Sequence, residues 1–118
     1  MEQIKFEDMV AALVKPGEAI LASLTPHDCH VLHMAVGISG EAGELLDAVK
    51  KAVIYRKPID MENVIEEVGD VLFYLEGVCQ GFNITIEQCK LANIAKLGKR
   101  YTGLKYSDTA AIAREDKA

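Results

Sequence analysis

The sequence contains no tryptophan, and aromatic residues make up only 6% of it. Aliphatic side chains and alanine must therefore form the core, because half of the 118 residues are hydrophobic. This composition excludes a disordered chain and favours helices over a β-sandwich or barrel. We expect a single all-α domain over residues 1–118.

Several other features are also missing. The formal net charge is −5, whereas a nucleic-acid-binding surface calls for clustered lysines and arginines. No apolar run approaches the roughly 20 residues of a membrane span, and no apolar segment of a secretory signal follows the start. The three cysteines form no Cys-x-x-Cys pair and are expected to be free, mostly as small hydrophobic side chains. We therefore predict a reduced, cytoplasmic protein with neither a nucleic-acid nor a membrane partner.

Apolar spacing and capping signals predict three long helices, at about residues 26–55, 61–81 and 86–101. Their start signals are Thr25 before a proline, Asp60, and Thr85 with a glutamine three residues later. The loop between the first two is short, so these helices should be antiparallel neighbours in a helical bundle. The flanking regions are predicted to be an N-terminal helical segment within residues 1–25 and a C-terminal tail over 102–118, with a short helix at 110–114 and four frayed residues at the end.

Two acidic pairs interrupt the apolar pattern of the first two long helices. Glu41 and Glu44 form one pair, and Glu67 and Asp70 repeat its spacing. Residues three apart lie on the same helix face, and across an antiparallel hairpin the two pairs can face one another. Four buried carboxylates are costly unless a cation lies among them. A donor set of oxygens alone favours Mg²⁺, with Mn²⁺ as a substitute, over zinc.

Each of these features also has a simpler interpretation. Either acidic pair alone would more often be a solvated helix face. Gly37, Gly40 and Gly43 in the first long helix indicate close helix–helix approach, room for a ligand, or both. A zinc site at His30 and His33 lacks matching ligands elsewhere, so we expect His33 to pack near the acidic site and donate to a phosphate or a base.

The third long helix carries a polar stripe made by Asn93, Lys96 and Arg100, beside Tyr101. Basic residues at a helix end can simply complement the helix dipole. An amide beside a lysine on one stripe fits recognition of a charged, oxygen-rich ligand better. Magnesium commonly shares its coordination sphere with phosphates, so the two features together indicate a nucleotide or another polyphosphate as substrate.

These motifs resemble the all-α nucleoside triphosphate pyrophosphohydrolase superfamily, and its MazG-like branch most closely. The resemblance rests on Glu41-x-x-Glu44 within Gly-Ile-Ser-Gly-Glu-Ala-Gly-Glu-Leu, and on Glu67-x-x-Asp70 within Glu-Glu-Val-Gly-Asp-Val-Leu. It continues in Asn93-x-x-Lys96 and covers roughly residues 32–106. The superfamily includes enzymes with several different nucleotide substrates, and the segment up to residue 25 matches none of its motifs.

The resemblance implies hydrolysis of a nucleoside triphosphate to the monophosphate and pyrophosphate. The four carboxylates would hold magnesium and form the catalytic centre, and Lys96, with Asn93 and Arg100, would contact the phosphates. It also implies a homodimer or homotetramer with sites at subunit contacts, which would complete the bundle. The alternative from another class is a non-catalytic helical oligomer that binds metal or nucleotide without turnover.

Overall fold

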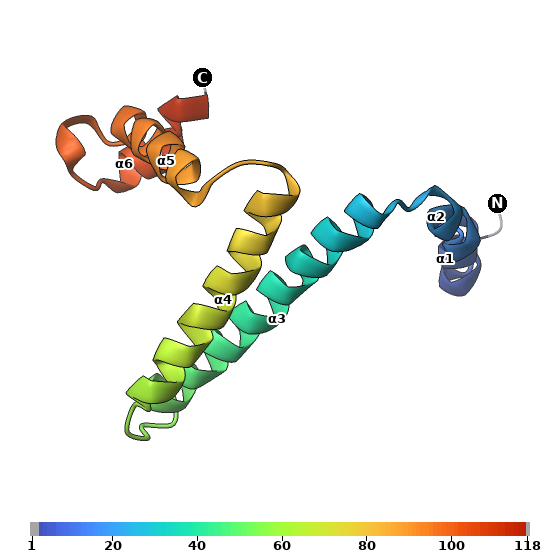
Figure 1. Cartoon of the computed structure of the whole chain (residues 1–118), viewed down its shortest axis with the longest axis horizontal. Helices are drawn as coiled ribbons and strands as arrows, with labels where there is room; N and C mark the ends of the chain where they lie inside the picture. Colours follow the sequence, from blue (N-terminus) through green and yellow to red (C-terminus); the bar gives the residue numbers. More distant parts are fainter. Residues whose placement is uncertain (1–2, 118) are drawn as a thin grey trace.

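The computed structural model describes residues 3–117, and this part of the chain contains helices and no strand. The expected all-α fold is therefore confirmed. Figure 1 shows a long antiparallel hairpin, with two short helices on one side of its open end and a C-terminal helical unit on the other. In chain order the elements are α1 (Phe6–Leu13), α2 (Gly17–Ser23), α3 (Pro26–Val53), α4 (Met61–Gly81), α5 (Ile86–Arg100), the 3₁₀ turn η1 (Thr102–Leu104), α6 (Asp108–Ala113) and the 3₁₀ turn η2 (Glu115–Lys117).

Capping residues set the start of the hairpin. The Thr25 hydroxyl accepts a hydrogen bond from the Asp28 N–H at 3.1 Å, and the Asp28 carboxylate accepts one from the Thr25 N–H at 3.0 Å. Pro26 occupies the first helical position of α3. On α4 the Asp60 carboxylate accepts from the Asn63 N–H at 3.1 Å. These local signals need no tertiary contact, and for this reason the sequence predicts both helix starts correctly.

Glycines allow α3 and α4 to approach closely in the half of the hairpin nearer its open end. A Cβ on Gly37 would collide with the ring of Tyr74, and one on Gly77 would collide with Met34. Met34 and Cys79 are the two buried hydrophobic residues in the described part of the chain. The sequence indicates close helix approach or room for a ligand at the interior glycines, and at Gly37 the structure shows close helix approach.

Two histidine side chains form hydrogen bonds between α3 and α4 near the open end of the hairpin. Nε2 of His27 lies 2.6 Å from the carbonyl oxygen of Gly81, and Nε2 of His30 lies 2.9 Å from that of Gly77. A protonated Nε2 donates to a carbonyl, so each ring joins the first two turns of α3 to the last turns of α4. His30 therefore acts as a helix-joining donor.

The C-terminal unit packs around α5 rather than along the hairpin. Thr85 and Gln88 form the predicted capping box of α5. The chain reaches α5 through Asn83, whose φ of 56° is left-handed. At the far end Arg100 donates from Nε to Asp116 at 2.8 Å and from Nη2 at 3.3 Å. The expected fraying is therefore wrong for residues 115–117, because the Asp116 side chain is only 1% exposed; residue 118 lies outside the described residues.

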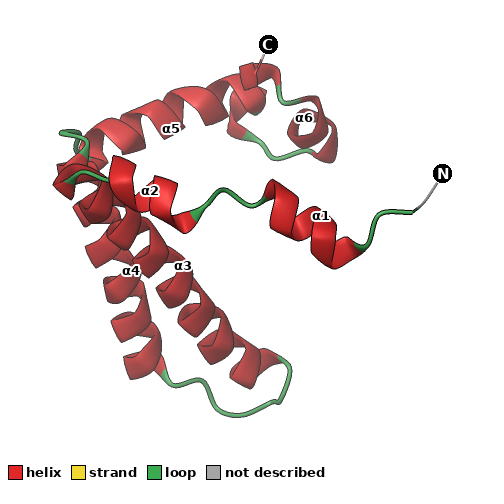
Figure 2. Ribbon diagram, turned by 90° about the vertical axis from the view of Figure 1, so that its right-hand side faces the viewer, coloured by secondary structure: helices red, strands yellow, loops and turns green. Residues whose placement is uncertain are grey.

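The overall shape is open. The Cα radius of gyration is 20.4 Å, whereas a compact domain of this length has about 13–14 Å. In Figure 2, α1 and α2 run away from the hairpin instead of packing along it. Neither helix contributes a buried side chain. That residues 1–118 act as one domain, completed by oligomerisation, stays a prediction.

Candidate metal centre

The acidic residues meet in the half of the hairpin nearer its closed end. One carboxylate oxygen from each of Glu41, Glu67 and Asp70 lies within 4.8 Å of the other two. Glu41 comes from α3, and Glu67 and Asp70 come from α4. Glu41 and Glu67 are half-buried, whereas Asp70 is exposed. The structure thus brings together three of the four predicted metal ligands.

Glu44, the fourth predicted ligand, lies one turn further along α3 and is exposed. Its carboxylate is close enough to influence both half-buried glutamates, because it contributes to the raised pKa of Glu41 and of Glu67. Three glycines close in sequence to these carboxylates have open space beside them. A Cβ built on Gly40, Gly43 or Gly69 would meet nothing within 4 Å. At Gly40 and Gly43 the glycines therefore leave open space, in contrast to Gly37.

Two oxygens in this cluster lack a partner. Oε2 of Glu41 and Oε2 of Glu67 are inaccessible to solvent and accept no hydrogen bond from residues 3–117. Burial, followed by the neighbouring carboxylates of Glu44 and Glu41, raises the pKa of Glu67 from 4.5 to about 7. Burial likewise raises the pKa of Glu41, with Glu44 adding to the effect. A cation among these oxygens would supply the missing partner and reverse both shifts.

The donor set decides which cation fits. All the candidate ligands are carboxylate oxygens, which suit the hard cations Mg²⁺ and Mn²⁺ better than zinc. No other group of three metal-ligating side chains lies close enough to share an ion in the described residues. The cysteines at 29, 79 and 89 are free and belong to no such group. The residues present therefore fit a divalent metal bound through oxygen.

An aromatic cluster lies beside the carboxylates, one turn along α4. The ring of His33 lies edge-on to that of Tyr74 with centroids 6.2 Å apart, and Phe73 contacts the same tyrosine at 5.2 Å. Tyr74 follows Asp70 by four residues, so it shares a helix face with that carboxylate. Through Tyr74, the His33 ring is connected to the helix face that carries Asp70. Its role toward a substrate stays a prediction.

The basic helix lies elsewhere in the chain. Helix α5, which carries Asn93, Lys96 and Arg100, begins beyond the open end of the hairpin and packs with η1, α6 and η2 (Figure 1). The Tyr101 ring packs near Tyr106, with centroids 5.6 Å apart. Within one chain the structure does not bring these residues to the carboxylates.

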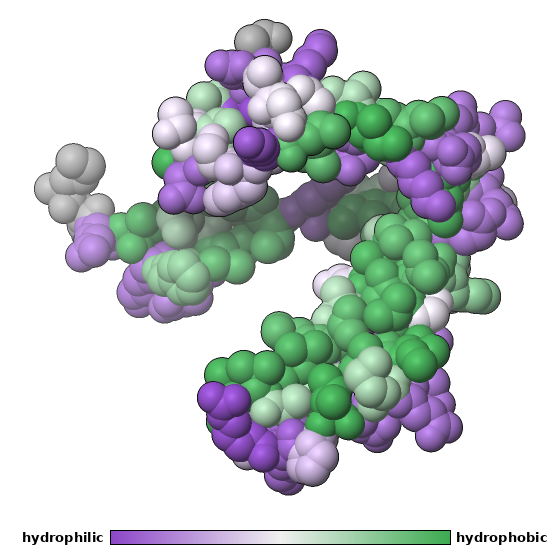
Figure 3. All heavy atoms as spheres, turned by 90° about the vertical axis from the view of Figure 1, so that its left-hand side faces the viewer, coloured by the Kyte–Doolittle hydropathy of each residue, from purple (hydrophilic) through white to green (hydrophobic). Residues whose placement is uncertain are grey.

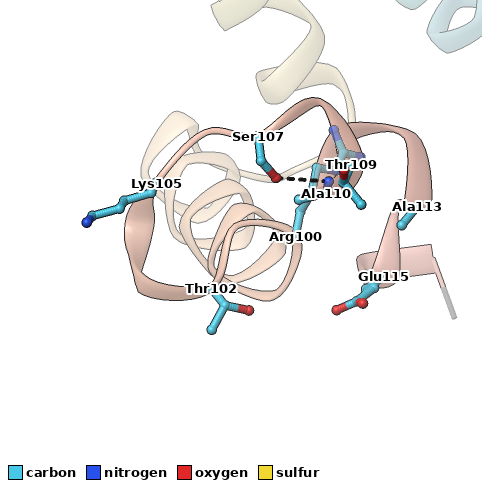
Figure 4. Close-up of a pocket in the computed structure, with 8 residues that line it drawn as sticks. All are labelled: Arg100, Thr102, Lys105, Ser107, Thr109, Ala110, Ala113 and Glu115. Carbon is cyan, nitrogen blue, oxygen red and sulfur yellow. Dashed lines mark hydrogen bonds between the residues drawn. The ribbon is translucent and has the colours of Figure 1, made fainter.

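Sequence reasoning missed Asp116, the partner of Arg100. The two residues are 16 positions apart, and no helical or strand period predicts such a contact. The same corner of the molecule contains a cavity of about 270 Å³. Figure 4 shows Arg100, Lys105 and Glu115 among its lining residues, with the Ser107 hydroxyl accepting from the Ala110 N–H at 3.0 Å.

An antiparallel helical hairpin with an oxygen-only acidic cluster places the chain in the class of all-α proteins with a candidate metal site. Within that class, the family model of the MazG nucleotide pyrophosphohydrolase domain matches residues 30–104. The match covers well over half of the chain and includes both acidic pairs, so the chain belongs to the MazG family. Comparisons with curated proteins and with solved structures found no match.

Proposed function

We propose that this protein is a magnesium-dependent nucleoside triphosphate pyrophosphohydrolase that serves nucleotide-pool clean-up. It would hydrolyse a ribo- or deoxynucleoside triphosphate to the monophosphate and pyrophosphate. MazG domains are nucleotide pyrophosphohydrolases, which supports the reaction class. The observation that carries the proposal is the unpartnered, solvent-inaccessible Oε2 of Glu41 and of Glu67 in a three-carboxylate cluster.

Glu41, Glu67 and Asp70 would hold Mg²⁺, with Glu44 completing the set and Mn²⁺ as a substitute. When bound, such an ion neutralises phosphate charge and polarises the phosphoryl group for attack by water. The protein fixes the carboxylates on two rigid helices, so little reorganisation is needed when the ion binds. A Cβ at Gly40 or Gly43 would meet nothing within 4 Å, so neither position would obstruct a phosphate chain bound beside the cluster.

The substrate contacts would come from α5. Lys96 and Asn93 would bind the phosphates, with Arg100 and Tyr101 at the end of the same helix and His33 beside the carboxylates. Arg100 uses two of its N–H donors to bind Asp116. A guanidinium has five N–H donors, so three are left for a substrate. Because α5 lies beyond the open end of its own hairpin, we propose that a second copy presents it to the cluster, in a homodimer or homotetramer. A cytoplasmic location stays a prediction; among residues 3–117 the helices are all too short or too polar to cross a membrane.

The test is pyrophosphate release from a panel of ribo- and deoxynucleoside triphosphates, measured with Mg²⁺ and with a chelator. Glu67→Gln should lower kcat/KM by at least about a hundredfold, the scale of losing one electrostatic element of a site. Glu66→Gln is the matched control, because Glu66 is the exposed neighbour on the same helix and its loss should leave turnover within about twofold.

The outcomes separate the two functions. A folded wild-type protein that releases no pyrophosphate from any member of the panel would overturn the proposed activity. Tight, magnesium-dependent nucleotide binding without product would instead favour the non-catalytic alternative. Equal losses in the two variants would show that the cluster at Glu67 has no special role.

A further inference from the structure

The N-terminal arm, residues 3–24, lies before the part of the chain that matches the family and has its own apolar stripe. Phe6, Val10 and Leu13 follow one another at helical spacing on α1. Phe6 is 73% exposed and Leu13 is 75% exposed. An amphipathic helix this short gains little stability from propensity alone, so the stripe needs a surface to cover it.

The hairpin offers an apolar groove near its open end. Its walls include Val31 and Leu32 on α3, Val78 on α4, and Phe82 just after α4, with Leu24 at the root of the arm. The cavity measures about 350 Å³, which is room for large aliphatic or aromatic side chains. Figure 3 shows hydrophobic side chains over a broad face of the same hairpin.

The exposed area is large enough to supply an obligate interface between two copies of the chain. The accessible surface is 9722 Å², about 3,400 Å² more than the ~6,300 Å² expected of a compact chain of 12.9 kDa. Two copies together carry about 6,800 Å² of this excess, and interfaces of obligate homodimers bury roughly 2,000–5,000 Å² summed over both partners. A second copy of the chain is a partner of the required size, and it carries the same groove.

We propose that the N-terminal arm crosses to a second copy of the chain, where the stripe of Phe6, Val10 and Leu13 docks on the apolar groove of that copy. The arm's own groove is a poor receptor, because α2 and the extended residues Val14 and Pro16 carry α1 away from it. Two copies related by a two-fold axis would exchange arms and bury both stripes and both grooves.

The charge of the arm disfavours a lipid surface as the occupant. Its charged residues are three acidic and two basic, namely Glu7, Asp8, Glu18, Lys5 and Lys15. Membrane-surface helices carry lysine and arginine on the polar face to meet anionic lipids. In α1 the first turn is acidic and the last turn has no basic residue. The arm therefore fits a protein surface.

The first test compares two neighbouring substitutions in the full-length protein. Val10→Asp places a charge in the stripe with little change in helix propensity. Ala11→Asp places the same charge away from the stripe at a larger cost to the helix, so it is a stringent control. Sedimentation equilibrium should show that Val10→Asp weakens self-association by at least about tenfold, the effect of losing a central contact. Ala11→Asp should stay within about twofold of wild type. A monomeric wild type, or equal effects of the two substitutions, would overturn the proposal.

The second test asks which chain receives the arm. A photo-crosslinking residue in place of Phe6 is activated in an equal mixture of ¹⁴N- and ¹⁵N-labelled chains. Mixed-label crosslinks from residue 6 to the groove around Val31 and Val78 would support exchange between copies. Crosslinks found only within one label would place the arm on its own chain and overturn the proposal, as would crosslinks between copies that avoid the groove. Pyrophosphate release is not a readout in either test, so a failure here leaves the proposed activity standing.

Discussion

The ring of Tyr74 lies directly against Gly37, so closely that residue 37 has no space for a side chain. Tyr74 is on α4 and Gly37 is on α3, and the contact lies one turn from Glu41 and Asp70. This pair therefore fixes the distance between the helices next to the carboxylates. Three glycines in one helix reduce its intrinsic stability, and at Gly37 the reason is this close approach.

Substitution of this glycine should destabilise the hairpin. Gly37→Ala should lower the free energy of unfolding by about 1–2 kcal/mol, because overpacking at Tyr74 outweighs the gain in helix propensity. Gly40→Ala is the control, since a Cβ there meets nothing within 4 Å, and it should raise that free energy by about 0.5–1 kcal/mol. Urea unfolding at one fixed protein concentration measures both. The prediction fails if the two alanines shift stability in the same direction.

Magnesium should stabilise the folded protein through the acidic cluster. At a concentration one hundred times its Kd, a ligand that binds only the folded state adds about 2.7 kcal/mol. We expect the melting temperature to rise on addition of Mg²⁺ and to fall back with a chelator. Asp70→Asn should remove this response, whereas Glu62→Gln on the same helix should retain it. Calorimetry with and without Mg²⁺ measures this shift in melting temperature for each variant. An unchanged shift in Asp70→Asn would contradict the metal assignment.

The apo protein should lose stability as the pH rises toward neutrality. Burial and nearby carboxylates raise the pKa of Glu67 from 4.5 to about 7. Protonated Glu67 therefore favours the folded state, and its contribution is full below pH 4.5 and lost as the pH passes 7. Chelator-treated protein should show this loss in its unfolding midpoint, and Glu67→Gln should show a flatter profile. Addition of Mg²⁺ near pH 7 should release protons. A wild-type profile as flat as that of Glu67→Gln would argue against the raised pKa.

The ion pair between Arg100 and Asp116 should lose its contribution to stability at low pH. Hydrogen bonds from Arg100 lower the pKa of Asp116 below its usual 3.8. The ionised pair thus contributes stability above pH 3.8, and this stability is lost as the pH falls through the lowered pKa. Asp116→Asn should speed amide hydrogen exchange in α6 and η2 at pH 7, whereas Glu115→Gln should not. Equal exchange in the two variants would mean that the pair does not hold the C-terminal unit.

Local chemistry explains which parts of the fold could be predicted. Thr25 with its proline, Asp60, and Thr85 with its glutamine fixed three helix starts without any tertiary contact. The facing of Glu41 and Glu67 followed from helical spacing and a short loop. The direction of α5 could not be predicted in this way, because it depends on a left-handed backbone conformation at Asn83, which the spacing of apolar residues does not specify.

Of the candidate site, the sequence predicted the arrangement of the carboxylates but not the position of the basic helix. The acidic half is built within a hairpin, so spacing along two neighbouring helices was sufficient. Lys96 and Asn93 are on a helix that one chain holds away from the cluster, and no pattern within the sequence states how copies are arranged. Asp116 was unpredictable for a related reason, since its contact with Arg100 spans 16 positions and three short helical elements, over which no single period runs.

The small core has a consequence for the life of the protein in a cell. Among residues 3–117 the buried hydrophobic residues are Met34 and Cys79. Because so few side chains are buried, a single chain has little folding stability to protect it from proteases. If association supplies the remaining burial, folded stability depends on how much protein is present. A newly made chain would then be degraded quickly when it is scarce and would persist once it is abundant. The abundance of the protein would in that case follow its rate of synthesis more steeply than in direct proportion.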